Sequence, residues 1–115
     1  MTNDIGMRIE LDLPYDEAVH KATAALKSEG FGVLTQIDMR ATLKQKLDVD
    51  FRRYVILGAC NPSLAHRVLA TNLDVGLLLP CNVTVYEAGD GSVVTAVDPI
   101  AMLGVMQDDP VAQEV

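Results

Sequence analysis

A three-residue turn between two strand-like segments constrains the fold more than any other feature of the sequence. Residues 83–87 and 92–97 are rich in β-branched side chains, and Gly89-Asp90-Gly91 separates them. Turn residues between two such segments are typical of a β-hairpin. The paired strands of a hairpin run in opposite directions, so this part of the sheet must be antiparallel.

The other elements follow from hydrophobic periodicity and from helix start and stop signals. Residues 5–13 alternate between apolar and charged side chains, with Met7, Ile9, Leu11 and Leu13 on the face expected to be buried. Pro14 and Gly30 are typical of the two ends of a helix. In chain order, we expect strands over 5–13, 31–37 and 53–59, which alternate with helices over 14–30, 38–47 and from Asn61 onward, then the hairpin, then a helix from Asp98 through Met106.

This irregular order disfavours a doubly wound parallel sheet and favours an α+β fold. We expect one mostly antiparallel sheet with helices packed on one face. The 115 residues fit one domain, with a core over about residues 5–107 and a frayed polar tail over 108–115.

Composition excludes several classes of function. The longest apolar run, near Val75 to Pro80, is far shorter than the ~20 residues that a membrane span needs. The N-terminal residues lack the pattern of a secretory signal, so we expect a cytoplasmic protein with no membrane partner. The net charge of −7 repels phosphate backbones, and we therefore expect no nucleic-acid partner.

The two cysteines are the main candidates for chemistry. Each is followed by an asparagine and lies near a proline, as Cys60-Asn61-Pro62 and as Pro80-Cys81-Asn82. Cys60 immediately precedes an expected helix, whose N-terminal end can stabilise a thiolate. Cys81 begins a strand that can pair beside the third strand, so the two sulfur atoms can lie close together.

A close cysteine pair is compatible with several roles. It can form a redox dithiol, bind a soft metal ion through Cys60 and Cys81, or carry sulfane sulfur. It can also do none of these, since unpaired cysteine often packs as a small buried hydrophobe.

The other residues that could bind a metal ion or take part in catalysis are expected to lie on the surface or in the core. We expect His20 and His66 to lie on the surface, because neither forms a ligand-spaced pair. Met102 and Met106 are expected to pack in the core, and Lys46 to lie on the solvated face of a short helix.

Three sequence elements also carry a resemblance to a known family. They are Gly30-Phe31-Gly32-Val33, Gly58-Ala59-Cys60-Asn61-Pro62, and Gly76-Leu77-Leu78-Leu79-Pro80-Cys81-Asn82-Val83 with Tyr86-Glu87. From about Met7 to about Met106 the chain resembles the family called domain of unknown function 302. The resemblance implies a β-α-β-β-β-β-α architecture similar to the TATA-box-binding protein, homodimers, and no established activity. The family pattern includes both cysteines, Cys60 and Cys81, and implies no established role for either.

Three hypotheses for function follow. The first is a binding module in which Cys60, Asn61, Cys81 and Asn82 hold a small ligand or a soft metal ion. The second is a homodimeric structural or interaction protein whose apolar stretch from Val75 to Leu79 forms the interface. The third is a thiol redox or sulfur-transfer protein with Cys60 as the nucleophile and Cys81 as the resolving thiol. The sequence leaves open whether the protein is an enzyme, and it indicates no particular cofactor.

Overall fold

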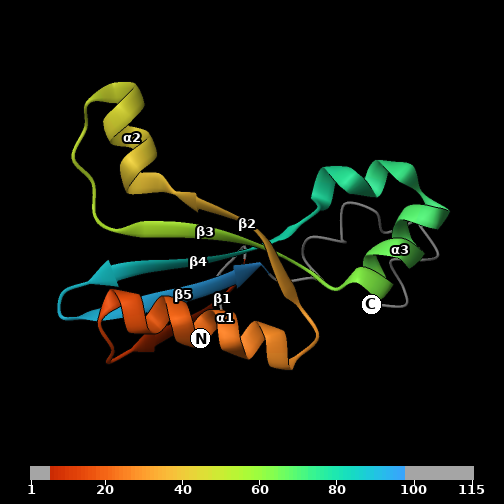
Figure 1. Cartoon of the computed structure of the whole chain (residues 1–115), viewed down its shortest axis with the longest axis horizontal. Coiled ribbons are helices and arrows are strands. Elements are labelled where there is room, and N and C mark those ends of the chain that lie inside the picture. The colour runs from red at the N-terminus through yellow and green to blue at the C-terminus, as the bar shows by residue number, and fades with distance from the viewer. Residues whose placement is uncertain (1–5, 98–115) are drawn as a thin grey trace.

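A computed structural model describes residues 6–97 as a five-stranded sheet with three α-helices (Figure 1). The strand order is β1-β5-β4-β3-β2, and every neighbouring pair is antiparallel. The elements are β1 (Gly6–Leu11), α1 (Tyr15–Ser28), β2 (Gly32–Asp38), α2 (Met39–Leu47), β3 (Tyr54–Cys60), α3 (Pro62–Thr71), the 3-10 helix η1 (Leu73–Leu78), β4 (Cys81–Ala88) and β5 (Gly91–Val97). The expected α+β class with a single antiparallel sheet is confirmed. The helix predicted from Asp98 to Met106 and the predicted tail lie outside the described residues.

Helix α1 covers one face of the sheet because its inward stripe is made of small side chains. Ala18 and Ala22 are buried, which lets the helix backbone approach the strands closely. Acidic residues in the first turn and Lys27 in the last turn favour this helix through its dipole. The buried strand residues that pack against it are Val55, Leu57, Val83 and Val85.

The register explains why these valines and leucines share a face. Val55 pairs with Val85 and Leu57 with Val83, at alternate positions along β3 and β4. The same alternation continues into β1, but there the predicted burial is wrong for two residues. Met7 is 45% exposed and Ile9 is 58% exposed, because α1 packs mainly over β2, β4 and β5, and of β1 it is Leu11 that packs against the core with Ala18 and Ala22.

The other two helices lie beyond opposite ends of the sheet (Figure 1). The Asp38 side chain caps α2 by accepting a 3.0 Å hydrogen bond from the Ala41 N–H, and α2 itself has no buried residue. At the other end α3 leads directly into η1, which the sequence reasoning missed. Of the helices in the described part of the chain, none is long and apolar enough to cross a membrane.

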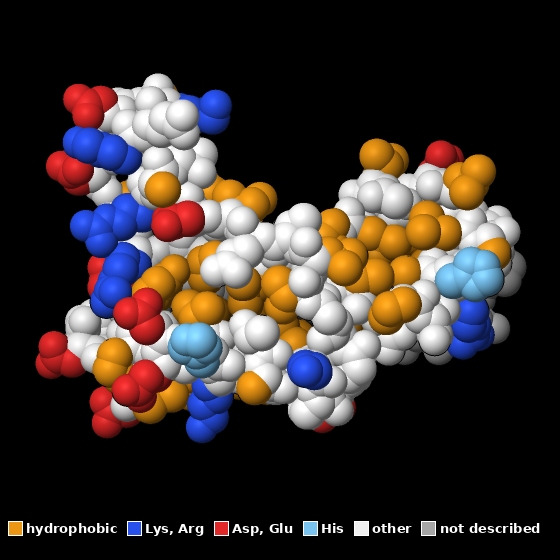
Figure 2. All heavy atoms as spheres, in the orientation of Figure 1, with side chains coloured by type: hydrophobic (Ala, Val, Ile, Leu, Met, Phe, Trp, Pro, Cys, Tyr) orange, Lys and Arg blue, Asp and Glu red, His pale blue; other side chains and the backbone are white. Residues whose placement is uncertain are grey.

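Charged and hydrophobic side chains are distributed differently over the two ends of the sheet (Figure 2). In that view, charged side chains gather around α2 and the neighbouring turns, and hydrophobic side chains gather over the lobe formed by α3 and η1. The two ends of the sheet therefore present different chemistry to solvent.

Candidate functional site

Both Cys-Asn elements meet at the end of the sheet that is nearest α3. The register pairs Ala59 with Cys81 and Gly58 with Asn82, so the last residues of β3 lie beside the first residues of β4. Neither cysteine forms a disulfide, and each is partly buried. The expectation that the strands bring these elements side by side is confirmed by this register.

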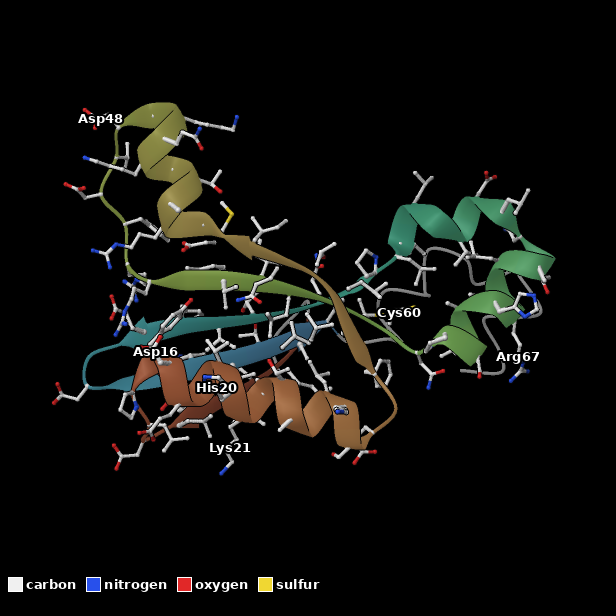
Figure 3. All side chains as sticks on the ribbon, in the orientation of Figure 1. Asp16, His20, Lys21, Asp48, Cys60 and Arg67 are labelled. Atoms are coloured by element: carbon white, nitrogen blue, oxygen red, sulfur yellow. The ribbon has the colours of Figure 1, made fainter. Side chains whose placement is uncertain are left out.

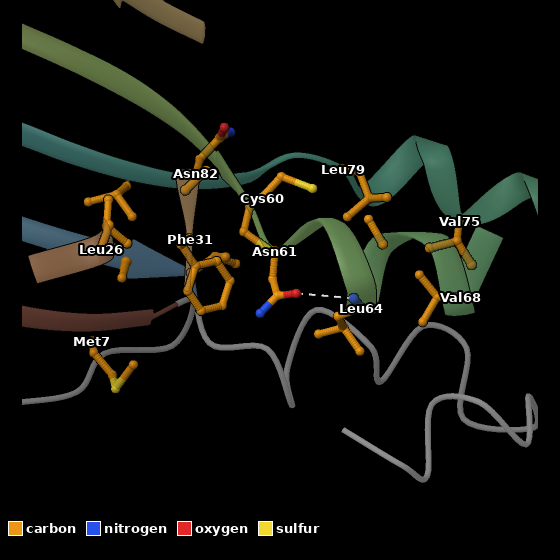
Figure 4. Close-up of a pocket in the computed structure, with 16 residues that line it drawn as sticks. Met7, Leu26, Phe31, Cys60, Asn61, Leu64, Val68, Val75, Leu79 and Asn82 are labelled. Atoms are coloured by element: carbon orange, nitrogen blue, oxygen red, sulfur yellow. Dashed lines mark hydrogen bonds between the residues drawn. The ribbon is translucent and has the colours of Figure 1, made fainter. Parts of the chain in front are cut away.

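A cavity of about 310 Å³ lies at this end of the sheet (Figure 4). Cys60, Asn61, Cys81 and Asn82 all line it. Its apolar wall comes from β1, α1, α3, η1 and the turn before β2, and includes Met7, Leu26, Phe31, Leu64, Val68 and Val75. No charged side chain belongs to the described wall, so the cavity is suited to uncharged and apolar groups.

The two cysteines approach the cavity wall in different ways. Cys81 lies opposite Ala59 and shares its face, whereas Cys60 is the next residue along β3 and alternation directs it to the other face. In Figure 4 the Cys60 thiol is directed toward Leu79 and away from Met7. The backbone register therefore brings the cysteines close together without aiming both thiols at one point.

Burial raises the pKa of the Cys81 thiol above its ordinary value of 9.0, and the nearby Cys60 raises it further. Both causes disfavour the thiolate. At neutral pH Cys81 is a protonated thiol, which acts as a small apolar group with a weak S–H donor.

The Asn61 side chain has a structural role at the cavity rim. Its Oδ1 accepts a 3.1 Å hydrogen bond from the Leu64 N–H and so caps α3 (Figure 4). A Cβ built on Gly30, which has φ +86°, would lie 3.3 Å from Asn61 Nδ2. Asn61 thus lies between α3 and the turn after α1. Because Asn61 Oδ1 already accepts the hydrogen bond from Leu64, it is less available to orient a ligand, which is the role expected of Asn61.

Gly58 is a residue of this region to which the sequence analysis assigned no role of its own. A Cβ there would collide with Thr35 Oγ1 and would lie 2.7 Å from Cγ of Pro80. Glycine within a strand is the sequence signal for such a close approach. Gly58 therefore allows the residue before Cys81 to pack against β3, which positions the start of β4.

The remaining candidates lie elsewhere. Within residues 6–97, no group of three or more His, Cys, Asp or Glu side chains is arranged to hold a metal ion. His20, His66 and Lys46 are exposed, as expected (His20 is labelled in Figure 3). Met102 and Met106 lie outside the described residues.

Comparisons with known proteins place the chain in a family. No curated protein matches it. The chain is similar to the protein in "Crystal structure of uncharacterized conserved protein DUF302 from Bacillus stearothermophilus", with 34% identity and a TM-score of 0.85 over 95% of this chain and 85% of that chain. The family model described as "Domain of unknown function DUF302" matches residues 7–115. The match extends over nearly the whole chain, and the protein belongs to the DUF302 family.

Proposed function

We propose that this protein binds a small, uncharged and mainly apolar molecule in the cavity beside Cys60 and Cys81. The observation that carries the proposal is an apolar cavity of about 310 Å³ whose wall includes both Cys-Asn elements. Ligand pockets commonly have volumes of about 300–1,000 Å³, are mainly apolar and carry a few polar groups. The cavity has these properties.

The wall restricts the charge of the ligand. A charged group moved from water into an apolar cavity needs an opposite charge or several hydrogen bonds to offset its lost hydration. The described wall has no ionic side chain. Of its polar side chains, the Cys60 thiol is directed toward Leu79, the Asn61 oxygen caps α3 and Asn82 is exposed to solvent. An uncharged and mainly apolar ligand satisfies these conditions best.

A neutral ligand is favoured over the soft metal ion that the two cysteines also suggest. Soft metal ions bind thiolates, and the raised pKa of Cys81 makes the loss of its proton more costly. Within residues 6–97, no group of three or more His, Cys, Asp or Glu side chains is placed to hold a metal ion. The same raised pKa disfavours Cys81 as the resolving thiol of a redox pair, since thiol exchange proceeds through the thiolate. The thiol-transfer hypothesis therefore ranks below ligand binding.

The experiment is a titration with N-phenyl-1-naphthylamine, a neutral apolar dye whose fluorescence rises on leaving water. We expect saturable binding to the wild-type protein and at least about ten-fold weaker binding to Ala65→Leu, because Ala65 lines the cavity and a leucine side chain fills part of it. Ala70→Leu is the matched control, since Ala70 is an exposed residue of the same helix outside the cavity wall.

Equal dye binding by wild type and both variants would contradict the proposal, as would an absence of saturable binding to the wild type. Thermal unfolding of all three proteins establishes that a weaker signal comes from the filled cavity rather than from unfolded protein.

A second candidate is a homodimeric interaction protein, and the surface of η1 favours it. Leu73 is 83% exposed and Leu77 is 88% exposed, and both belong to η1. The predicted interface from Val75 to Leu79 needs correction at its first residue, because Val75 is buried. Exposed apolar groups that lie together commonly mark an interface.

Light scattering after size-exclusion chromatography tests this candidate. A dimer that dissociates in Leu77→Ser and persists in Leu47→Ser, which changes an exposed leucine of α2, would support an interface at η1. A wild-type monomer at micromolar concentration would overturn it.

A further inference from the structure

The wall of the apolar cavity includes a row of side chains that crosses three neighbouring strands. Met7 of β1 pairs with Ala96 of β5, and Ala96 pairs in turn with Val83 of β4. All three residues line the cavity. Because the side chains of directly paired residues lie on the same face of a sheet, this row forms a continuous apolar strip at the sheet side of the cavity.

The apolar strip continues beyond the cavity along β1. Met7 lines the cavity and is also exposed to solvent, so the cavity wall reaches the surface beside this strand. Ile9 lies two residues further along β1, where alternation places it on the same face as Met7. Ile9 is exposed and pairs with the partly buried Val94 of β5. An apolar surface therefore leads from the cavity wall out along β1.

The far end of the cavity lies in a different part of the fold. Leu64 and Val68 of α3 and Val75 of η1 line it there. In Figure 4, Met7 and Val75 lie at opposite ends of the set of lining side chains. Together with the exposed surface of β1, the cavity thus forms a long apolar track rather than a compact hole.

From these observations we propose that the ligand of the cavity is an unbranched, neutral aliphatic chain, such as that of a long-chain alcohol, aldehyde or ester. This inference rests on the ligand binding proposed above and adds the shape of the ligand. The inner part of the chain lies along Val83, Ala96 and Met7, and its outer part covers Ile9. Each CH₂ group that leaves water for an apolar surface favours binding, so a linear chain gains from the whole track, whereas a compact molecule gains only from the cavity.

The sheet geometry sets the length of chain that reaches Ile9. Two strand spacings separate Val83 from Met7, which corresponds to about 10 Å at about 4.8 Å per spacing. The two-residue step from Met7 to Ile9 along β1 adds about 7 Å. A zigzag carbon chain with bonds of about 1.5 Å advances about 1.3 Å per bond, so a chain of roughly twelve carbons covers this path.

The test is displacement of N-phenyl-1-naphthylamine from the wild-type protein by alcohols. The alcohols 1-dodecanol and 2-butyl-1-octanol have the same formula, but the first is linear and the second is branched. We expect the linear alcohol to bind at least about five-fold more tightly. Among 1-hexanol, 1-octanol, 1-decanol and 1-dodecanol, affinity should rise about two- to four-fold for each added CH₂ group.

A matched pair of variants tests the outer part of the track. Ile9→Ser should weaken the binding of 1-dodecanol at least about five-fold and that of 1-hexanol less than about two-fold, because only the longer chain reaches Ile9. Ile37→Ser is the control, since Ile37 is an exposed isoleucine of β2 that does not line the cavity. It should bind both alcohols as the wild type does. Ile9→Leu should bind 1-dodecanol as the wild type does, because it keeps an apolar side chain of similar size there.

Equal affinity for the linear and the branched alcohol would overturn the inference, as would an Ile9→Ser variant that binds 1-dodecanol as the wild type does or loses affinity equally for long and short alcohols. The comparison of the two alcohols uses only the wild-type protein, so it stands even where a variant proves unstable in thermal unfolding. Saturable dye binding by the wild type is a separate readout of the cavity. Its presence together with any of these results shows that the chain-shaped ligand is wrong and the cavity proposal is not, whereas its absence overturns both.

Discussion

The two ends of the β3–β4 pair are closed in different ways. At the end near α2, Arg53 donates to both carboxylate oxygens of Glu87, through its backbone N–H at 3.0 Å and its Nε at 3.2 Å. Tyr54 and Tyr86 stack there with ring centroids 5.2 Å apart. At the opposite end, the start of β4 and the end of β3 border an apolar cavity instead.

This difference in packing gives the closely packed end a structural role and the end with the cavity a binding role. Close-packed regions lose stability when a side chain is shortened or lengthened, because neighbouring atoms cannot readjust without cost. A region with an existing void tolerates both changes better. The sheet under α1 should therefore lose stability on mutation as a hydrophobic core does, and the wall of the cavity should tolerate the same changes better.

The largest expected effect is the loss of a leucine from the packed region. Leu57 is fully buried under α1, and Leu57→Ala should lower the free energy of unfolding by about 2–5 kcal/mol in urea denaturation. Leu64→Ala, in the cavity wall, should cost about 1 kcal/mol, since its partly exposed side chain already borders a void. Equal losses for the two variants would remove the contrast between the regions.

The same enlargement should have different results in the two regions. Ala18 is fully buried between α1 and the sheet, and Ala18→Leu should destabilise the fold by about 1–3 kcal/mol through overpacking. Ala65→Leu should change stability by less than about 1 kcal/mol, because the added atoms enter the cavity. Thermal denaturation of both variants measures this, and a large loss for Ala65→Leu would mean that the cavity wall is as tightly packed as the core.

A smaller effect should appear as a pH dependence at the α2 end. Hydrogen bonds from the Arg53 backbone and side chain hold the pKa of Glu87 below its ordinary value of 4.5. A carboxyl whose folded pKa is depressed stabilises the fold above its unfolded pKa, and this contribution is lost as pH falls through the folded pKa. Below about pH 4.5, melting temperature should therefore fall more steeply with pH in wild type than in Glu87→Gln. Parallel curves for the two proteins would show that Glu87 makes no such contribution.

The smallest effect concerns the thiol at the cavity. In a Cys60→Ser variant the remaining thiol is Cys81, and burial keeps its pKa above the ordinary value of 9.0. Alkylation by iodoacetamide at pH 7 should be slower than that of free cysteine, because the thiolate is the reacting species. Mass spectrometry over time measures the rate. Alkylation as fast as that of the free amino acid would revive the thiol-transfer hypothesis.

Sequence periodicity predicted most of the elements, and the departures have clear causes. The 3-10 helix η1 was missed because its apolar residues do not share one buried face, so they give no helical periodicity. Val75 is buried, and Leu77 is exposed to solvent. The face of β1 that contains Met7 alternates as a buried strand does, but α1 packs mainly over β2, β4 and β5 rather than over this edge. Local pattern predicts which side chains share a face, and it does not predict what packs against that face.

The candidate site was predictable in part. The strand boundaries at Cys60 and Cys81 indicated that both could lie at one end of the sheet, and the register agrees. The direction of the Cys60 thiol, the capping role of Asn61 and the need for glycine at position 58 depend on neighbours far away in the sequence. The groove lined by α1, by Gln36 and Asp38 of β2 and by Val55 of β3 was not predicted, because it exists only once the helix lies over the sheet.

By itself, the sequence determined the α+β class, the hairpin of β4 and β5, the start of α3 at Pro62 and the family resemblance. These depend on local backbone preferences, turn chemistry and short-range periodicity. Tertiary structure decided the strand order, the raised pKa of Cys81 and the apolar cavity. Those properties arise from burial and proximity, which are set by the packing of distant segments and not by the identity of any one residue.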